Sequence, residues 1–163
     1  MSEVIGESPF KGLGLEAAIL HYCKYQERCH MEVRNKLYEL GFTTPEVERQ
    51  LAGLIETGVL NEERFARAFA GGKFRMKQWG REKIKQQLKL RKISDYCIKK
   101  AMTEIPPDDY ENTLNKLAFK KTAEIKGDRS MLSKKGKLYR YLAQKGYERD
   151  LIMDVIKICL ETD

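Results

Sequence analysis

Histidine, tryptophan and proline are scarce in this sequence, whose 163 residues include two His, one Trp and four Pro. With so few histidines, the commonest general base and metal ligand is nearly missing. The glycines at 12–14 form no phosphate-binding loop, because neither a strand precedes them nor Lys-Ser/Thr follows them. Paired carboxylates such as Asp108-Asp109 fall where helices are expected to begin, a position that the helix dipole favours. We therefore expect no enzymatic activity and no cofactor.

Long apolar runs are also missing, and none of those present could span a bilayer. The beginning, MSEVIGESPFKGLG, lacks the apolar core of a secretory signal. The four cysteines, Cys23, Cys29, Cys97 and Cys159, lie in helix-like stretches without close pairing. The cluster HYCKYQERCH at 21–30 matches no common zinc spacing, so buried thiols are favoured over a metal site. These features predict a cytoplasmic protein with reduced cysteines, no membrane contact and no metal.

The alternation typical of β-strands is absent, and apolar residues recur instead at intervals of three and four, which indicates helices. Three segments, 33–47, 84–98 and 138–152, share a longer pattern of apolar positions that extends a few residues beyond each. The matched positions are Val33, Leu37, Phe42, Val47 and Leu51; then Ile84, Leu88, Ile93, Ile98 and Met102; then Leu138, Leu142, Tyr147, Ile152 and Ile156. Each copy describes a helix that stops, turns and is followed by another helix, so the chain contains an internal repeat.

The turn inside each copy has residues suited to it. Gly41 and Gly146 tolerate the left-handed backbone that ends a helix, while the middle copy has Lys92 at that position. Thr44 and Ser94 are suitable residues for starting the next helix. A further helix precedes each copy, at about 15–28, 62–77 and 109–126.

The predicted fold class is therefore all-α, an elongated tandem array of three three-helix repeats. The expected repeats are residues 13–59, 60–105 and 106–163, after a flexible tail at 1–12. IPPDD at 105–109 separates the last two repeats, since two prolines do not continue a helix.

Positive charge is concentrated in the middle of the chain. Residues 61–100 contain 13 Lys and Arg against four Asp and Glu. The net charge of this segment, 13 − 4 = +9, is larger than the net charge of +7 for the whole sequence. This pattern indicates a polyanionic partner, although a solvated face of ordinary helices would look the same. The basic face predicted to bind that partner comprises Arg64, Arg67, Lys73, Arg75, Lys77, Arg81, Lys83 and Lys85.

Aromatic residues lie among these cations. Phe65 and Phe69 are four residues apart and are predicted to be core. Trp79, directly before the turn at Gly80, could belong to the core or stack on a nucleic-acid base, and a core position is the commoner role.

The segment NEERFARAFAGGKFRMKQWGREKIKQQLKLRKI, residues 61–93, resembles the signature of the RecX family of bacterial regulatory proteins. The resemblance rests on Asn61-Glu62, Arg64-Phe65-Ala66, Phe69, the basic run from Lys73 to Lys77, Gly80, Lys83-Ile84, Leu88 and Lys92-Ile93. Asn61 and Lys92 depart from the family pattern, which usually has Asp and Gly there. Weaker likeness extends over about residues 15–160.

The resemblance implies a non-enzymatic protein of tandem three-helix repeats that binds the RecA recombinase filament on single-stranded DNA. It also implies inhibition of filament assembly, ATP hydrolysis, strand exchange and co-protease activity, and hence a role in the SOS response. The alternative is a helical repeat protein that binds single- or double-stranded DNA directly in DNA repair. We expect a monomer, because the repeat ends carry charged residues rather than a large apolar patch.

Overall fold

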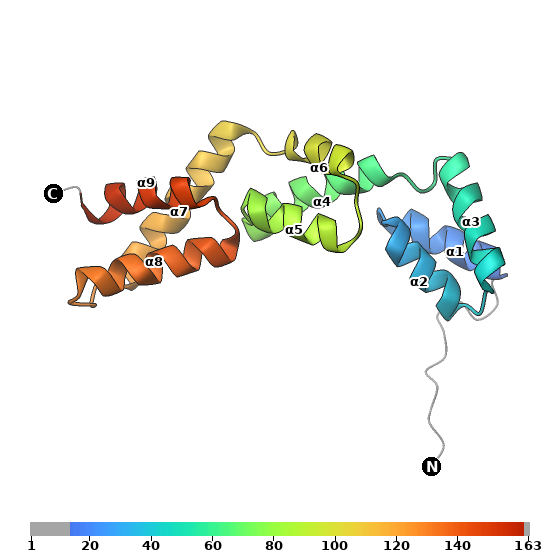
Figure 1. Ribbon diagram of the computed structural model, residues 1–163, viewed down its shortest axis with the longest axis horizontal. Coiled ribbons are helices and arrows are strands. Elements are labelled where there is room, and N and C mark those ends of the chain that lie inside the picture. Colours follow the sequence, from blue (N-terminus) through green and yellow to red (C-terminus); the bar gives the residue numbers. More distant parts are fainter. Residues whose placement is uncertain (1–13, 162–163) are drawn as a thin grey trace, which may run out of the picture. The chain divides into compact units, whose positions relative to one another are not determined.

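The computed structural model describes residues 14–161, and these residues form α-helices without any strand (Figure 1). The helices are α1 (Leu15–Tyr25), α2 (His30–Glu39), α3 (Thr44–Glu56), α4 (Glu62–Lys77), α5 (Arg81–Leu90), α6 (Asp95–Met102), α7 (Pro107–Glu124), α8 (Met131–Lys145) and α9 (Arg149–Leu160). The predicted all-α class is confirmed. The tail predicted at 1–12 lies outside the described residues.

The chain divides into two compact units, the first ending at Phe65 and the second beginning at Ala66, early in α4. Each unit has its own packed interior. The borders predicted for the three repeats at 59/60 and 105/106 stay a prediction.

In the first unit, α2 packs against both α1 and α3. The core is made by one apolar stripe from each helix and by the residue that leads into α4: Ile19, Cys23, Val33, Leu37, Val47, Leu51, Leu54 and Leu60. Thr43, and not the predicted Thr44, caps α3. Its amide donates to the Glu46 side chain at 2.7 Å, which closes a capping box, and Thr44 is the first helical residue.

The predicted turns occur in all three copies of the repeat. Gly41, Lys92 and Gly146 have φ of 93°, 58° and 95°, so even the lysine adopts the left-handed conformation. In each copy the next amide donates to the carbonyl five residues earlier, as in a Schellman motif: Phe42 to Leu37, Ile93 to Leu88 and Tyr147 to Leu142, at 3.1, 3.1 and 3.2 Å.

The repeat positions form the interior, as predicted. Val33, Ile84 and Leu138 are fully buried, and the leucine four residues after each is also fully buried. Only Phe42 and Met102 among the matched positions are half-buried. The third preceding helix begins at Pro107, earlier than predicted, because proline fits the first turn of a helix.

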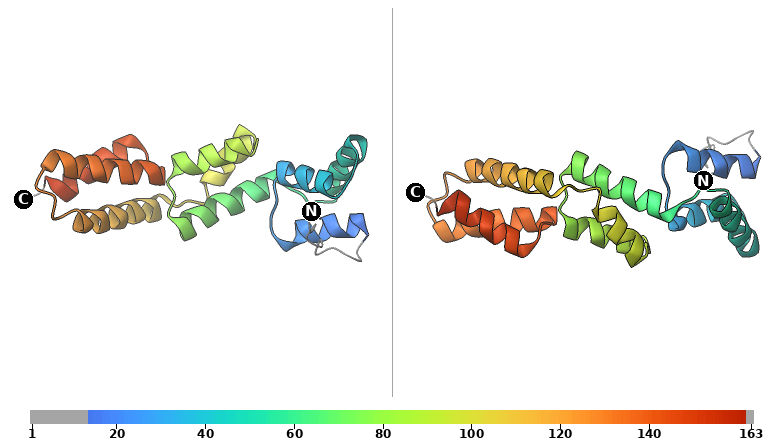
Figure 2. Two further views of the ribbon diagram at one scale, coloured as in Figure 1. Left: turned by 90° about the horizontal axis from the view of Figure 1, so that it is seen from below. Right: turned by 90° about the horizontal axis from the view of Figure 1, so that it is seen from above.

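In the second unit, α5 packs against α6, and α7, α8 and α9 pack against one another (Figure 2). The loop before α5 also lies directly on the loop before α9. The Gly80 amide donates to the Lys145 carbonyl at 2.7 Å, and the Glu82 amide donates to the Gly146 carbonyl at 2.9 Å. A Cβ on Gly80 would lie 2.2 Å from the carbonyl atoms of Gly146. We call this contact the glycine joint, because only glycine permits such an approach.

Two buried tyrosines complete the glycine joint. The rings of Tyr110 and Tyr147 lie 5.0 Å apart. The Tyr110 hydroxyl donates to Glu148 Oε2 at 2.5 Å and accepts from the Arg81 amide at 3.0 Å. The Tyr147 hydroxyl donates to the Gln78 carbonyl at 2.9 Å. Burial raises the pKa of both phenols, so they remain protonated donors.

Candidate interaction surface

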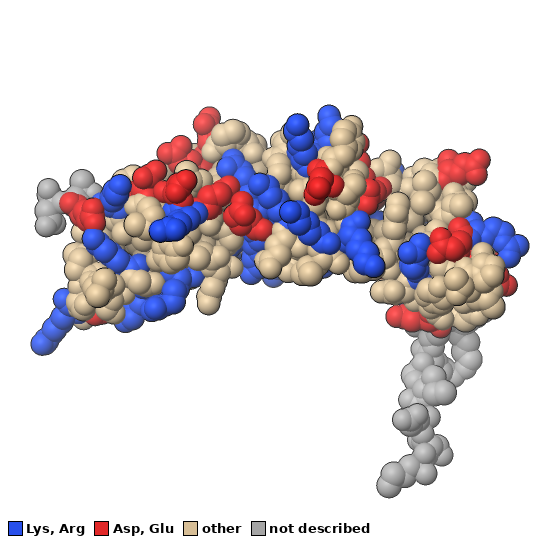
Figure 3. All heavy atoms as spheres, in the orientation of Figure 1, with Lys and Arg blue, Asp and Glu red and all other residues tan. Residues whose placement is uncertain are grey.

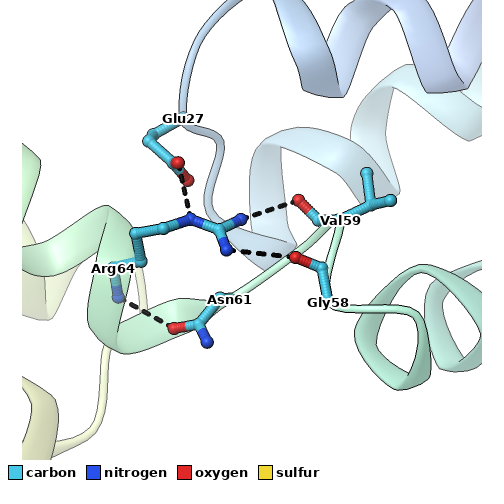
Figure 4. A network of polar contacts seen from close by, with 5 residues as sticks. All are labelled: Glu27, Gly58, Val59, Asn61 and Arg64. Carbon is cyan, nitrogen blue, oxygen red and sulfur yellow. Dashed lines mark hydrogen bonds and ion pairs between the residues drawn. The ribbon is translucent and has the colours of Figure 1, made fainter.

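The predicted basic residues play different roles, and Arg64 is a structural clamp in the first unit (Figure 4). Its Nε donates to Glu27 at 2.6 Å, and its two terminal nitrogens donate to the carbonyls of Gly58 and Val59 at 3.1 and 2.9 Å. Asn61 caps α4 by accepting from the Arg64 amide at 2.8 Å. The guanidinium therefore joins the segment after α1 to the segment before α4.

Arg67 and Arg81 are ion-paired within the second unit. Arg67 Nη1 lies 2.9 Å from Glu104, and Arg81 Nη1 lies 3.3 Å from Glu148. The Arg81 guanidinium also lies 3.9 Å from the ring centroid of Tyr110, beside the glycine joint. Both arginines therefore form ion pairs within the protein, which their position in the sequence did not reveal.

Lys73 and Lys83 lie over aromatic rings, together with a third cation that the predicted basic face did not include. Phe69 and Trp79 meet edge to face with centroids 6.5 Å apart. Lys73 Nζ lies 5.4 Å from the Phe69 centroid and 5.1 Å from that of Trp79, and Lys83 Nζ lies 4.6 Å from Trp79. Arg91 Cζ lies 4.8 Å from Phe69. We call these five residues the aromatic–cation cluster; all of them are half-buried.

The end of α4 explains why Trp79 faces Phe69. Gln78 has a φ of 56°, and this left-handed residue turns the chain back over the helix. The Trp79 amide then donates to the Lys73 carbonyl at 3.3 Å. Because a glutamine has no intrinsic preference for this conformation, the surrounding contacts hold it there.

Arg75, Lys77 and Lys85 are the least engaged of the predicted residues. Arg75 and Lys77 are exposed, and within residues 14–161 no carboxylate pairs with either side chain. Lys85 Nζ lies 3.7 Å from Glu82, a weak contact one turn away. Lys and Arg side chains cover part of the face that α5 presents in Figure 3.

A second basic surface, on α8, was missed by the sequence analysis. Figure 3 shows Lys and Arg along this helix, which contains five basic residues and no acidic one: Lys134, Lys135, Lys137, Arg140 and Lys145. Lys137 pairs with Asp128 at 2.8 Å, and Lys135 pairs with Glu161. A count of charges for each helix, instead of for the middle of the chain, would have found it.

The aromatic residues that α4 buries differ from the prediction at one position. Phe65 is buried as predicted, but Phe69 is half-buried and Phe74 is the second buried ring. Ala66 and Ala70 occupy the middle of the buried face, which places Phe69 at its edge. Trp79 is half-buried, so it is not a core residue.

The cysteines of the HYCKYQERCH segment are buried free thiols, and burial raises the pKa of both Cys23 and Cys29. Among the residues that the structure describes, no cluster of His, Cys, Asp and Glu is arranged as a metal site. No helix in the described part of the chain has the length and apolarity needed to cross a membrane.

The fold and this surface define a class: helical repeat proteins that carry a set of cationic side chains around half-buried aromatic rings. Comparison of the sequence with known families identifies one family within that class. Residues 61–102 match the second three-helix domain of RecX, and residues 108–156 match the third. The chain belongs to the RecX family, a family of regulatory proteins.

Relatives match over most of the chain. The regulatory protein RecX of Clostridium perfringens (strain 13 / Type A) is 29% identical over 160 residues, which cover 96% of this chain and 73% of that protein. The regulatory protein RecX of Prosthecochloris aestuarii is also 29% identical, over 83% of this chain and 86% of that one.

Solved structures show the same fold. The crystal structure of RecX from Lactobacillus salivarius superposes with a TM-score of 0.78 at 24% identity, over 89% of this chain and 94% of that one. A second crystal structure of regulatory protein RecX gives a TM-score of 0.78 at 21% identity, over 86% of this chain and 69% of that one. The helical repeat array is therefore shared with these proteins.

Proposed function

We propose that this protein binds the RecA recombinase filament on single-stranded DNA and inhibits filament assembly, ATP hydrolysis, strand exchange and co-protease activity. Membership of the RecX family supports the proposal. The observation that carries it on this chain is the exposed pair Arg75 and Lys77, without a carboxylate partner in residues 14–161, inside the segment that matches the second RecX domain.

The chemistry of the surface suits such a partner. Exposed cations without internal partners keep their charge available for an acidic protein face or a phosphate. Contacts spread over successive helical domains add up to a strong total from weak parts. Regulation then needs only preferential binding to one state of the filament, and no bond has to be broken. Within this proposal the protein acts in the cytoplasm as a monomer.

The test is ATP hydrolysis by the cognate RecA on single-stranded DNA, titrated with the protein. The wild type should lower hydrolysis at substoichiometric concentration. The double variant Arg75→Gln/Lys77→Gln should need about tenfold more protein for the same effect, since two charge contacts are removed. The matched control Lys99→Gln/Lys120→Gln removes two exposed cations elsewhere in the second unit and should behave as wild type. Arg64, Arg67 and Arg81 are left unchanged because their ion pairs are structural.

If wild-type protein leaves hydrolysis unchanged, the proposal is wrong. If both double variants lose inhibition equally, the total charge matters and the Arg75–Lys77 surface does not.

The second candidate function is direct DNA binding in DNA repair, and the aromatic–cation cluster is the observation that favours it. Tight binding to bare DNA that falls steeply with salt, without any effect on RecA, would support this alternative.

A further inference from the structure

The aromatic–cation cluster combines flat rings with positive charges that the protein does not neutralise. Lys73 lies within 5.4 Å of the centroids of both Phe69 and Trp79, whereas Lys83 lies over Trp79 and Arg91 over Phe69. The polar contacts of two of these cations go to neutral groups. Lys83 Nζ donates to the Gln144 carbonyl at 3.3 Å, and Arg91 donates to the backbone and side-chain oxygens of Gln87 at 3.0 Å.

The same unit shows what a neutralised cation looks like. Lys121 lies 5.1 Å from the Tyr141 centroid, which resembles the geometry at Trp79, but it also pairs with Glu124 at 3.3 Å. No carboxylate in the described part of the chain pairs with Lys73, Lys83 or Arg91. The negative ring faces offset the three charges only in part, so a positive potential remains at a partly exposed tryptophan.

We propose that this cluster is a direct binding site for single-stranded nucleic acid, in which a base stacks on Trp79 and the neighbouring phosphates meet the three cations. A ring beside cations matches the two parts of a nucleotide, because bases stack on aromatic side chains and phosphates pair with Lys and Arg. An acidic peptide would use the charges but not the ring. A duplex would use the charges too, but its bases are already stacked and unavailable.

The two lysines have the flexibility that binding requires. Their ammonium groups rest over the Trp79 ring at 5.1 and 4.6 Å. An incoming base takes the ring face, and the displaced ammonium groups swing on their long stems to the phosphates on either side. The rigid elements stay in place, since the Trp79 backbone is held on α4 and the core lies beneath.

This inference rests on the second candidate function, direct DNA binding, and deepens it by naming the site and the class of nucleic acid; it requires no recombinase. Trp79 is the single tryptophan of the chain, so the intrinsic fluorescence of the full-length protein reports on this site. Titration with a short oligothymidylate should quench the emission to saturation, and added salt should reverse the quenching.

Substitutions inside and outside the cluster test whether the oligonucleotide binds there. The triple variant Lys73→Gln/Lys83→Gln/Arg91→Gln should weaken oligonucleotide binding at least about tenfold and flatten its salt dependence, because fewer counterions are released. Lys121→Gln, which removes a paired cation over a different ring, should bind as wild type. With a labelled oligonucleotide and anisotropy detection, Trp79→Leu should weaken binding about tenfold, and Trp79→Phe should weaken it less. Far-UV circular dichroism checks that each variant is folded; if Trp79→Leu is not, the cation variants and Trp79→Phe carry the test.

Three results would overturn the proposal: no quenching by oligothymidylate, an equal loss in Lys121→Gln and the triple variant, or polyglutamate of matched charge that quenches and binds equally well. The last would identify the cluster as a site for acidic protein. RecA inhibition is measured separately on the same proteins, so a variant that loses oligonucleotide binding and still inhibits RecA leaves the proposed function intact.

Discussion

Replacing Gly80 with alanine should disrupt the glycine joint and destabilise the second unit by about 3 kcal/mol. The backbone of Gly80 has a φ of −74°, which alanine adopts without strain, so the effect comes from the added methyl group. That methyl would lie 2.2 Å from the Gly146 carbonyl, and no side-chain rotation relieves a contact with backbone.

The magnitude follows from the contacts that must separate. The loops share two backbone hydrogen bonds, at 2.7 and 2.9 Å, and the Tyr147 hydroxyl adds a third at 2.9 Å. At about 1 kcal/mol each, their loss gives the expected destabilisation of about 3 kcal/mol.

The assay is urea unfolding followed by circular dichroism and by Trp79 fluorescence. Gly72→Ala is the matched control: a Cβ there meets nothing within 4 Å, and alanine should stabilise α4 by up to about 1 kcal/mol. The two substitutions are chemically identical and should have opposite signs. A loss below about 1 kcal/mol for Gly80→Ala would refute the view that the two loops require glycine.

Three further predictions concern single side chains. Gln78→Gly should raise the free energy of unfolding by about 1 kcal/mol in the same assay, since glycine tolerates a φ of 56°; a loss would mean that the glutamine side chain makes a stabilising contact. Arg64→Gln should destabilise the first unit by about 1 kcal/mol, because its two carbonyl contacts lose a charged donor and the partly exposed ion pair with Glu27 adds little; an equal effect of Glu27→Gln would assign the loss to the ion pair instead. Hydrogen bonds, chiefly from Lys137, hold the pKa of Asp128 below its usual range, so its stabilisation is present above that range and is lost as pH falls through the folded-state pKa; Asp128→Asn should therefore differ from wild type in urea unfolding at neutral pH and converge with it in acid, and a constant difference would contradict this.

The sequence predicted the repeat because burial at Val33, Ile84 and Leu138 depends on local helical periodicity. It also predicted a turn at Lys92, although lysine disfavours the left-handed conformation that ends a helix. The apolar positions on both sides of Lys92 required the chain to reverse there. Such features are set by residues close together along the chain.

The sequence did not distinguish cations that form ion pairs within the protein from cations that remain exposed. Arg67, Arg75 and Arg81 look alike in the sequence, yet two have carboxylate partners 37 and 67 residues away. The glycine joint was invisible for the same reason, since Gly80 and Gly146 meet only after separate helices have packed. Tertiary pairing decides which cations remain available, and helical periodicity carries no information about it.

The glycine joint shows that the unit repeated in the sequence is smaller than the unit that packs together in the structure. The second and third domains are distinct matches in sequence, but the Gly80 amide and the Gly146 carbonyl find their partners only across the border between those domains. A chain cut after α6 would expose the Gly80 amide and remove Tyr147 from Gln78. Chimaeras that exchange RecX domains should therefore move the second and third together as one cassette, while a crossover between them would have to preserve glycine on both sides.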